Sequence, residues 1–266
     1  MSLAERTKTI LTSMGRGALK LRGQNFLIDE RVLDRIIETS GVKKGDCVLE
    51  IGPGLGFLTE KLLARGARVV AIELDAGFAE YLEKQFGEKI KVFCDDALKI
   101  DFQTLRSIFG GEKFKIVANI PYNITGELLE KIMVSDDVIE SATLLVQKEV
   151  AERVVAKPPE MNRLALIIQA YAKPSLEFTV PAGAFLPPPK VTSAVLKMTL
   201  ENWQTKHLVM RPAINLALKA FNAPRKKIRT TLKLGDDVFI VSGLTGDERP
   251  AELSIEKWLK LSKKQV

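Results

Sequence analysis

The stretch Cys47-Val48-Leu49-Glu50-Ile51-Gly52-Pro53-Gly54-Leu55-Gly56 decides the fold of this 266-residue chain. Its first half is a short apolar run of the kind that forms a buried strand. Its second half is a turn rich in glycine, which lets a backbone bend tightly and approach a bound molecule closely. Helical spacing of apolar residues then runs from Leu55 to Arg65. Strand, glycine turn and helix in this order indicate the first unit of an open α/β sheet, with a binding site at the turn.

Strands and helices alternate on both sides of this stretch, from residue 30 to about residue 157. Strands that alternate with helices usually pair in parallel and are covered by helices on both faces, so the pattern predicts an α/β fold. Apolar runs predict strands at 47–51, 68–74, 90–94, 114–118 and 142–146, and helical spacing predicts helices at 30–39, 55–65, 76–86, 125–133 and 148–156.

The pattern changes in the last part of the chain. Residues 176–180 and 191–200 are strand-like and flank a proline-rich segment, whereas the region after residue 202 has helical spacing alone. We therefore expect a larger domain at 1–201, with a basic N-terminal extension, and a small helical domain at 202–266. Helices are predicted at 164–171, 212–221, 224–232 and 254–261.

Composition places the chain among globular proteins, with 46% apolar and 27% charged residues. No stretch approaches the apolar length of a membrane span, and the N-terminus lacks the apolar core of a secretory signal, so we expect a cytoplasmic protein. Cys47 and Cys94 lie in or beside apolar runs and are predicted to be buried free thiols in a reducing compartment. His207 is the only histidine, which argues against a histidine-rich metal site, and no metal is expected.

The net charge of +7 is concentrated near the C-terminus. Residues 201–266 have 13 Lys and Arg against 7 Asp and Glu, and Lys206 to Lys233 includes eight basic residues and no acidic one. Residues 1–24 form a second basic block. A solvated helix face is the simpler explanation, but an unbroken block of this length favours a nucleic acid over a membrane surface. The candidate RNA contacts are Arg225, Lys226, Lys227 and Arg229.

Acidic residues follow the next two predicted strands. The turn has the spacing Gly-x-Gly-x-Gly rather than that of dinucleotide enzymes, and Pro53 removes an amide that a pyrophosphate would use. Glu73 ends the second strand, where a carboxylate can accept hydrogen bonds from both hydroxyls of a ribose. Asp96 follows the third strand and can accept from the amine of an adenine. Together these features indicate an adenosine with an extension that lacks phosphates, namely S-adenosylmethionine.

The tetrapeptide Asn119-Ile120-Pro121-Tyr122 follows the fourth predicted strand. Asn119 has an amide oxygen, Pro121 has a carbonyl on a stiff backbone, and Tyr122 has a flat ring for stacking. Together they can hold a planar base by an exocyclic amine. Asn-x-Pro is also ordinary turn chemistry, and only the glycine turn and the acids upstream favour the functional interpretation.

Six motifs occur in order and closely resemble those of the ribosomal RNA adenine dimethyltransferase family, over roughly residues 20 to 235. Two further features favour the branch that modifies small-subunit RNA: the run 121–125 and the basic run 220–232. The six motifs are Gly23-Gln24-Asn25-Phe26-Leu27, the glycine turn at 50–56, Ile72-Glu73-Leu74-Asp75, Asp96-Ala97, residues 119–125, and Phe185 to Ser193.

The resemblance implies a class I S-adenosylmethionine-dependent methyltransferase fold, with a mostly parallel seven-stranded sheet and a small helical C-terminal domain. It implies dimethylation of the 6-amino groups of two adjacent adenosines near the 3′ end of small-subunit ribosomal RNA, in a precursor of the small subunit. The sequence does not indicate an oligomeric state, and we expect a monomer. The cofactor site would include Asn25, Leu27, Gly52, Gly54, Glu73, Asp96 and Asn119. The target adenine would lie among Asn119, Pro121, Tyr122 and Phe185.

The chain departs from the family pattern at residues 158–163, where small-subunit enzymes usually have Tyr-Gly before Arg-Leu. Several alternatives remain open at this point. A large-subunit RNA methyltransferase of the macrolide-resistance type is the nearest, and a ribosome-assembly or transcription factor on the same scaffold would have lost the cofactor motifs. A dinucleotide oxidoreductase and a DNA adenine methyltransferase are disfavoured by the glycine spacing and by the Gly23–Leu27 motif, respectively.

Overall fold

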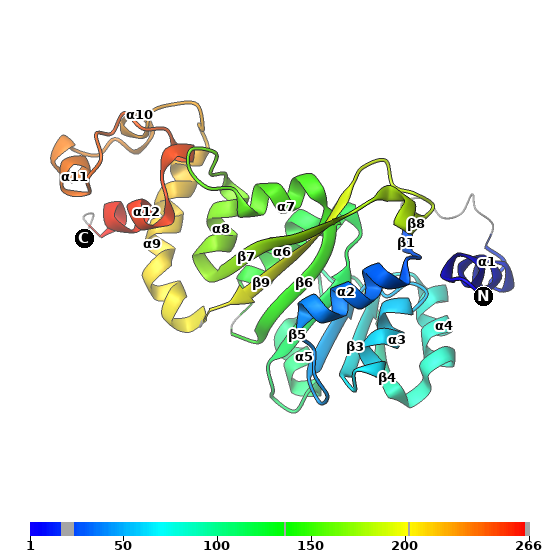
Figure 1. Ribbon diagram of the computed structural model, residues 1–266. Coiled ribbons are helices and arrows are strands. Elements are labelled where there is room, and N and C mark those ends of the chain that lie inside the picture. Colours follow the sequence, from blue (N-terminus) through cyan, green and yellow to red (C-terminus); the bar gives the residue numbers. More distant parts are fainter. Residues whose placement is uncertain (17–23, 136, 202, 264–266) are drawn as a thin grey trace. The chain divides into compact units, whose positions relative to one another are not determined.

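A computed structural model describes residues 1–16, 24–135, 137–201 and 203–263 of the chain (Figure 1). It divides the chain into two compact units, residues 1–151 with 175–199 and residues 152–174 with 200–266. The first residue of the predicted Gly23–Leu27 motif, and Lys20 and Arg22 of the N-terminal basic block, lie outside the described residues. Among the described helices, none is long and apolar enough to cross a membrane.

The first unit is built on a mostly parallel seven-stranded sheet, and the predicted fold class is confirmed. The strand order is β4-β3-β2-β5-β6-β9-β7. β2 pairs in parallel with β3 and β5, β3 with β4, and β5 with β6, whereas β9 runs antiparallel to β6. The strands are β2 (Cys47–Ile51), β3 (Arg68–Glu73), β4 (Ile90–Cys94), β5 (Phe114–Asn119), β6 (Ile139–Gln147), β7 (Ala172–Val180) and β9 (Ser193–Leu200).

Helices bury apolar side chains against both faces of this sheet. Successive side chains of a strand point to opposite faces, so Val117 of β5 joins the core beneath α2, α3 and α4, whereas Phe114 packs against Phe102 and Phe109 at α5. The helices associated with this unit are α1 (Leu3–Ser13), α2 (Glu30–Ser40), α3 (Phe57–Ala64), α4 (Ala76–Phe86), α5 (Phe102–Ile108), α6 (Thr125–Met133) and the start of α7 (Lys148–Val155).

Capping side chains explain where several of these helices begin. Asp29 accepts hydrogen bonds from the backbone at the start of α2, and Asp75 does the same for α4. Ser2 and Glu5 form a reciprocal capping box at α1, a helix for which the sequence analysis predicted no element. Arg16, just after α1, pairs with Asp75 at 2.5 Å and lies over the Phe78 ring, so the N-terminal segment is attached beside α4.

A separate two-stranded antiparallel ladder joins two segments that are far apart in the sequence. β1 (Phe26–Leu27) pairs with β8 (Phe185–Leu186), with Leu27 opposite Phe185. The backbone N–H of Ile28 extends the pairing by donating to the carbonyl of Ala184 at 2.8 Å. This ladder fixes the segment that precedes α2, and with it the side chain of Asn25.

The second unit is helical and has its own core. Residues 152–174, which the sequence analysis placed in the larger domain, cluster with the C-terminal helices because α8 (Arg163–Tyr171) packs against α9 (Trp203–Phe221). Leu166 of α8 accordingly lies in one apolar cluster with Ala217 of α9 and Trp258 of α12. The other helices of this unit are α10 (Ile228–Leu232), α11 (Asp236–Val241) and α12 (Ile255–Ser262), with a 3-10 turn at 250–252. The first unit has 3-10 turns at 87–89, 122–124 and 182–184.

The segment at 158–163, where the sequence departs from the family pattern, leads into the cap of α8. Asn162 accepts a hydrogen bond from the Ala165 N–H at 3.1 Å and donates to the Arg153 carbonyl at 2.7 Å. Met161 is buried, and its N–H donates to the Ala251 carbonyl at 3.1 Å. The segment is therefore held by hydrogen bonds and burial within the second unit.

The prediction for the cysteines is half right. Cys47 is buried, whereas Cys94 is exposed. β4 is the edge strand of the sheet, and its burial decreases toward its end. An apolar run therefore identified the strand but could not show that it lies at the edge.

Candidate active site

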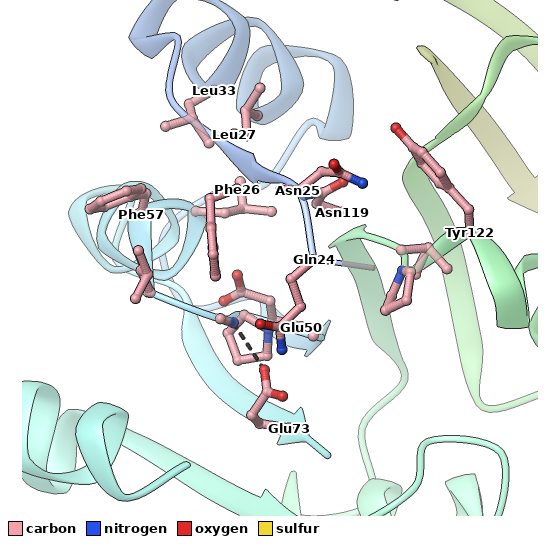
Figure 2. A pocket seen from close by; sticks show the side chains of 17 residues that line it. Gln24, Asn25, Phe26, Leu27, Leu33, Glu50, Phe57, Glu73, Asn119 and Tyr122 are labelled. Atoms are coloured by element: carbon pink, nitrogen blue, oxygen red, sulfur yellow. Dashed lines mark hydrogen bonds between the residues drawn. The ribbon is translucent and has the colours of Figure 1, made fainter. Parts of the chain in front are cut away.

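The ends of three neighbouring parallel strands meet at one cavity. Ile51 of β2 lies opposite Ile72 of β3, and β5 pairs on the other side of β2, so the carboxyl ends of all three strands lie at the same edge. The cavity has a volume of about 120 Å³ and is bordered by the glycine turn, Glu73, residues 119–122 and residues 24–27 (Figure 2). The predicted glycine turn and the Asn119–Tyr122 tetrapeptide therefore share one cleft.

The glycine turn leaves no room for side chains. Gly54 has φ +55°, and a Cβ there would lie 3.2 Å from the Phe26 ring. Gly56 has φ +77°, and its Cβ would lie 2.6 Å from the buried ring of Phe86. L side chains rarely adopt a positive φ, so glycine is required here both by the backbone and by the close approach of the Phe26 and Phe86 rings.

Glu73 is held in place by the backbone around it. One of its carboxylate oxygens accepts from the Gly54 N–H at 3.0 Å (Figure 2). The other accepts from the Asp75 N–H at 3.0 Å. Burial raises the pKa of Glu73, and these backbone donors oppose the rise. Each oxygen keeps one further lone pair, so the carboxylate can accept two more hydrogen bonds without moving.

Glu50 is a second acid at the cavity, and the sequence analysis gave it no role. Its side chain is 2% exposed and accepts from the Thr59 hydroxyl at 2.6 Å. Burial raises its pKa to about 8, and the neighbouring charge of Glu73 adds to the rise. The sequence did contain a signal for a role of Glu50, because an acidic residue is unusual in a buried strand that leads into a glycine turn.

Asn119 is oriented by the segment before β1. Its amide nitrogen donates to the backbone carbonyl of Asn25 at 3.2 Å. The two residues lie next to each other in Figure 2. The amide oxygen accepts no hydrogen bond from the described residues, and it is the group that remains for a ligand in the cavity. The glycine turn is close by, since a Cβ at Gly52 would lie 3.5 Å from the Pro121 ring.

The carbonyl of Pro121 already has two partners. It accepts from the Ile124 N–H at 3.2 Å and from the Thr125 hydroxyl at 3.3 Å. Ile120 also borders the cavity, and its carbonyl accepts no hydrogen bond from the described residues. A carbonyl oxygen has two lone pairs, so the acceptor role expected of Pro121 fits Ile120 better.

Tyr122 borders the cavity and is fixed at its hydroxyl. The Tyr122 oxygen lies 2.6 Å from the hydroxyl of Ser193, a fully buried residue at the start of β9. Burial raises the pKa of Tyr122. The hydroxyl of Tyr122 thus sets the direction of the ring.

Two predicted site residues lie outside the lining of this cavity. Asp96 follows β4, next to β3 in the sheet, but does not border the cavity. Phe185 is 2% exposed and packs in the core, opposite Leu27 in the β1–β8 ladder. Its ring is therefore covered, and its expected role in stacking on a base remains a prediction.

The predicted RNA contacts belong to the second unit and fall into two pairs. Arg225 and Lys226 are exposed and have no ion pair within the part of the chain that the structure describes. Lys227 and Arg229, in contrast, contact Asp247 at 3.3 and 3.0 Å, respectively. The first pair is the better candidate for a polyanion, because its charge is not already neutralised.

The chemistry of the cavity fits a cationic adenosine derivative better than a phosphate. Its walls are mainly apolar, from Phe26, Leu33 and Phe57 among others, and its acidic side chains among the described residues are Glu50 and Glu73. No Lys or Arg of the described residues borders it. A buried carboxylate such as that of Glu73 attracts a sulfonium or ammonium group and repels a pyrophosphate.

This combination of a mixed seven-stranded sheet and a glycine turn facing an Asn-Ile-Pro-Tyr tip defines a class I methyltransferase. A model of the family described as ribosomal RNA adenine dimethylase matches residues 19–265. The chain therefore belongs to this family, and the resemblance seen in the sequence is confirmed.

Relatives and solved structures agree with this assignment over nearly the whole chain. Ribosomal RNA small subunit methyltransferase A of Pseudomonas savastanoi pv. phaseolicola is 38% identical, covering 92% of this chain and 93% of the relative. The protein of the same name from Alkaliphilus oremlandii is 32% identical, covering 97% and 95%. A dimethyladenosine transferase from Plasmodium falciparum superposes with a TM-score of 0.74 at 27% identity, covering 89% and 95%. The 23S rRNA methyltransferase ErmE gives 0.73 at 26%, covering 90% and 99%.

Proposed function

We propose that this protein transfers methyl groups from S-adenosylmethionine to the 6-amino groups of two adjacent adenosines near the 3′ end of small-subunit ribosomal RNA. The observation that carries the proposal is the position of Asn119. Its amide nitrogen is anchored to Asn25, and its oxygen remains available in the same cavity as Glu73. An acceptor for an amine and a carboxylate for a ribose thus border one cavity.

Residues around the glycine turn would bind the donor. Glu73, held by the N–H groups of Gly54 and Asp75, would accept from the ribose hydroxyls. Asp96, at the end of the neighbouring strand β4, would accept from the adenine amine, and Asn25 and Leu27 would complete the wall. S-adenosylmethionine would supply an electrophilic methyl group on a positively charged sulfur, and the carboxylate of Glu73 would favour that charge.

Asn119 and Ile120 would hold the target amine. An adenine amine is a poor nucleophile because its lone pair is delocalised into the ring. If the Asn119 oxygen and the Ile120 carbonyl each accept one of its hydrogens, the nitrogen becomes more pyramidal and its lone pair points toward the methyl group. Orientation is the main contribution of the protein. The methylated amine is acidic enough to release its proton to water, so no strong base is required.

The base must leave its stack to reach this position. Tyr122, held by Ser193, would stack on one face of the extruded base and offset part of this cost, by about 1–3 kcal/mol. After the first transfer the amine has a single hydrogen. The second transfer must therefore proceed with one of the two hydrogen bonds lost and with room for a methyl group.

The helical second unit would bind the RNA backbone. Its exposed cations Arg225 and Lys226 are suited to phosphate contacts, which supply affinity without reading sequence. Small-subunit RNA is favoured as substrate because the relatives at 32% and 38% identity are small-subunit enzymes, whereas ErmE is 26% identical.

Nucleoside analysis by mass spectrometry tests the proposal. Ribosomal RNA is compared between cells with the gene, without it, and without it but complemented by the Asn119→Ala variant. We expect dimethyladenosine in the small-subunit RNA of the first cells only, and primer extension then gives its position. Dimethyladenosine that depends on this gene but occurs in large-subunit RNA would refute the substrate, and unchanged RNA in all three would refute the activity.

A further inference from the structure

Asp96 begins a tight helical turn that ends at Ile100. The backbone carbonyl of Asp96 accepts from the N–H groups of Lys99 at 2.8 Å and Ile100 at 3.2 Å. One carboxylate oxygen of Asp96 accepts from the Leu98 N–H at 2.9 Å. A helical turn of this kind leaves its last carbonyls without partners from within the turn. The carbonyls of Ala97 and Ile100 are in this position.

A lysine from another part of the chain binds both of these carbonyls. The Lys131 ammonium donates to the Ala97 carbonyl at 2.9 Å and to the Ile100 carbonyl at 2.5 Å, and it lies 4.8 Å from the centre of the Phe102 ring. Lys131 belongs to α6, the helix that follows directly after the Asn119–Tyr122 tip. One side chain therefore connects the turn of Asp96 with the helix that supports the proposed target site.

We propose that Lys131 is a positioning residue that holds Asp96 where its carboxylate can accept from the adenine amine of the methyl donor. The inference rests on the proposed function, since it takes Asp96 as the acceptor for that amine. Lys131 acts through the backbone and not by contact with the donor: it caps the turn at its carbonyl end, and the turn sets the direction of the Asp96 side chain.

The surroundings of Lys131 support a specific role over a general surface charge. The side chain is half-buried, and within the described residues it has no ion pair closer than 4 Å, so its hydrogen bonds are made to the two carbonyls. Burial lowers the pKa of Lys131, while the carboxylates of Asp101 and Asp96 oppose that change. A cation kept in such a place stabilises a particular backbone geometry, because without it two carbonyls lose their partner.

The position of the Asp96 carboxylate can be tested by how strongly the protein prefers a ligand with a 6-amino group over one without it. The probes are S-adenosylhomocysteine and S-inosylhomocysteine, which has an oxygen in place of that amine, and titration calorimetry gives both dissociation constants. We expect the wild type to prefer the adenosine compound by about tenfold or more, the range of a hydrogen bond to a charged group. In Lys131→Met the preference should decrease at least threefold, with less than a twofold change for the inosine compound. Lys131→Arg should restore it.

Three variants separate the possible causes. Lys113→Met is the matched control, because Lys113 is a surface lysine paired with Asp137 at 2.6 Å, and it should keep the wild-type preference. Asp96→Ala should abolish the preference. If Asp96→Ala abolishes it but Lys131→Met retains it, or weakens both compounds equally, the role of Lys131 is refuted. If Asp96→Ala retains it, the assignment of Asp96 within the proposed function is refuted. Lys131→Gln, which removes the charge and shortens the side chain, replaces Lys131→Met should the latter fail to fold.

Discussion

The cavity and the basic segment 225–229 differ in how their polar side chains are exposed and held. At the cavity, polar groups are buried or half-buried and are fixed by specific hydrogen bonds, as Asn119 is by Asn25 and Glu73 by Gly54. In the basic segment the cations are exposed, and half of them are paired with Asp247. Buried groups act through geometry and tolerate little change, whereas exposed charges act additively and are screened by salt. Chemistry should thus depend on single residues and RNA affinity on many.

The largest effect is expected at Asn119. Asn119→Ala removes the acceptor that we propose for the target amine, and the loss of one such group should lower turnover by about 10²–10³-fold. Affinity for RNA should change less than about threefold, because we propose that exposed cations of the second unit supply it. Methyl transfer to small-subunit RNA and filter binding measure the two quantities. Equal losses in both would remove the distinction between the two regions.

Tyr122 should show the next largest effect. Tyr122→Ala removes a stacking face worth about 1–3 kcal/mol, so turnover should fall about tenfold to a hundredfold. Tyr122→Phe keeps the ring and loses only the contact with Ser193, and it should cost a few-fold. Single-turnover rates measure both. If the two variants lose the same activity, the hydroxyl and not the ring is the important group.

The buried acid Glu50 should make the stability of the cavity region depend on pH, unlike an exposed acid. Its pKa is about 8 in the folded protein, against an ordinary value of 4.5. The folded state therefore binds more protons between these values, and its stability decreases as pH rises toward 8. From pH 6 to pH 9 the wild type should lose roughly 2 kcal/mol more than Glu50→Gln. Urea unfolding at both pH values measures the difference, and the exposed Glu83→Gln should behave like the wild type.

The smallest effect is expected in the basic segment. Arg225→Gln with Lys226→Gln should lower RNA affinity less than about tenfold and reduce the slope of log affinity against log salt by one to two. Lys227→Gln with Arg229→Gln is the matched control and should change the slope less, because Asp247 already neutralises these residues. Binding at several salt concentrations gives the slopes. Equal changes would show that ion pairing does not reduce their contribution.

Elements with strong apolar patterns were predictable from the sequence. The strands 47–51 and 90–94 and the helices 76–86 and 125–133 have the predicted bounds. The helix expected from Pro212 begins instead at Trp203, with Pro212 inside it, because packing of α9 against α8 and α12 outweighs the one backbone donor that proline lacks. Local sequence does not reveal such packing.

The site was predictable in its parts but not in its contacts. Strand ends with Glu73 and Asn119 could be recognised, because parallel strands bring their carboxyl ends to one edge. The two-residue ladder that brings Asn25 to Asn119 could not, since β1 and β8 are too short to have a period and are about 160 residues apart in sequence. The partners of the Pro121 carbonyl and of Lys131 likewise depend on tertiary distances.

The anchoring of Asn119 has a consequence for which side chain this position accepts. Aspartate has the same shape, but it would set a negative oxygen against the carbonyl oxygen of Asn25, where the amide now donates. Repulsion would turn the carboxylate away or require a proton on it. The backbone carbonyl of Asn25, in the segment before β1, therefore favours an amide over an acid at position 119, whether or not a substrate is bound.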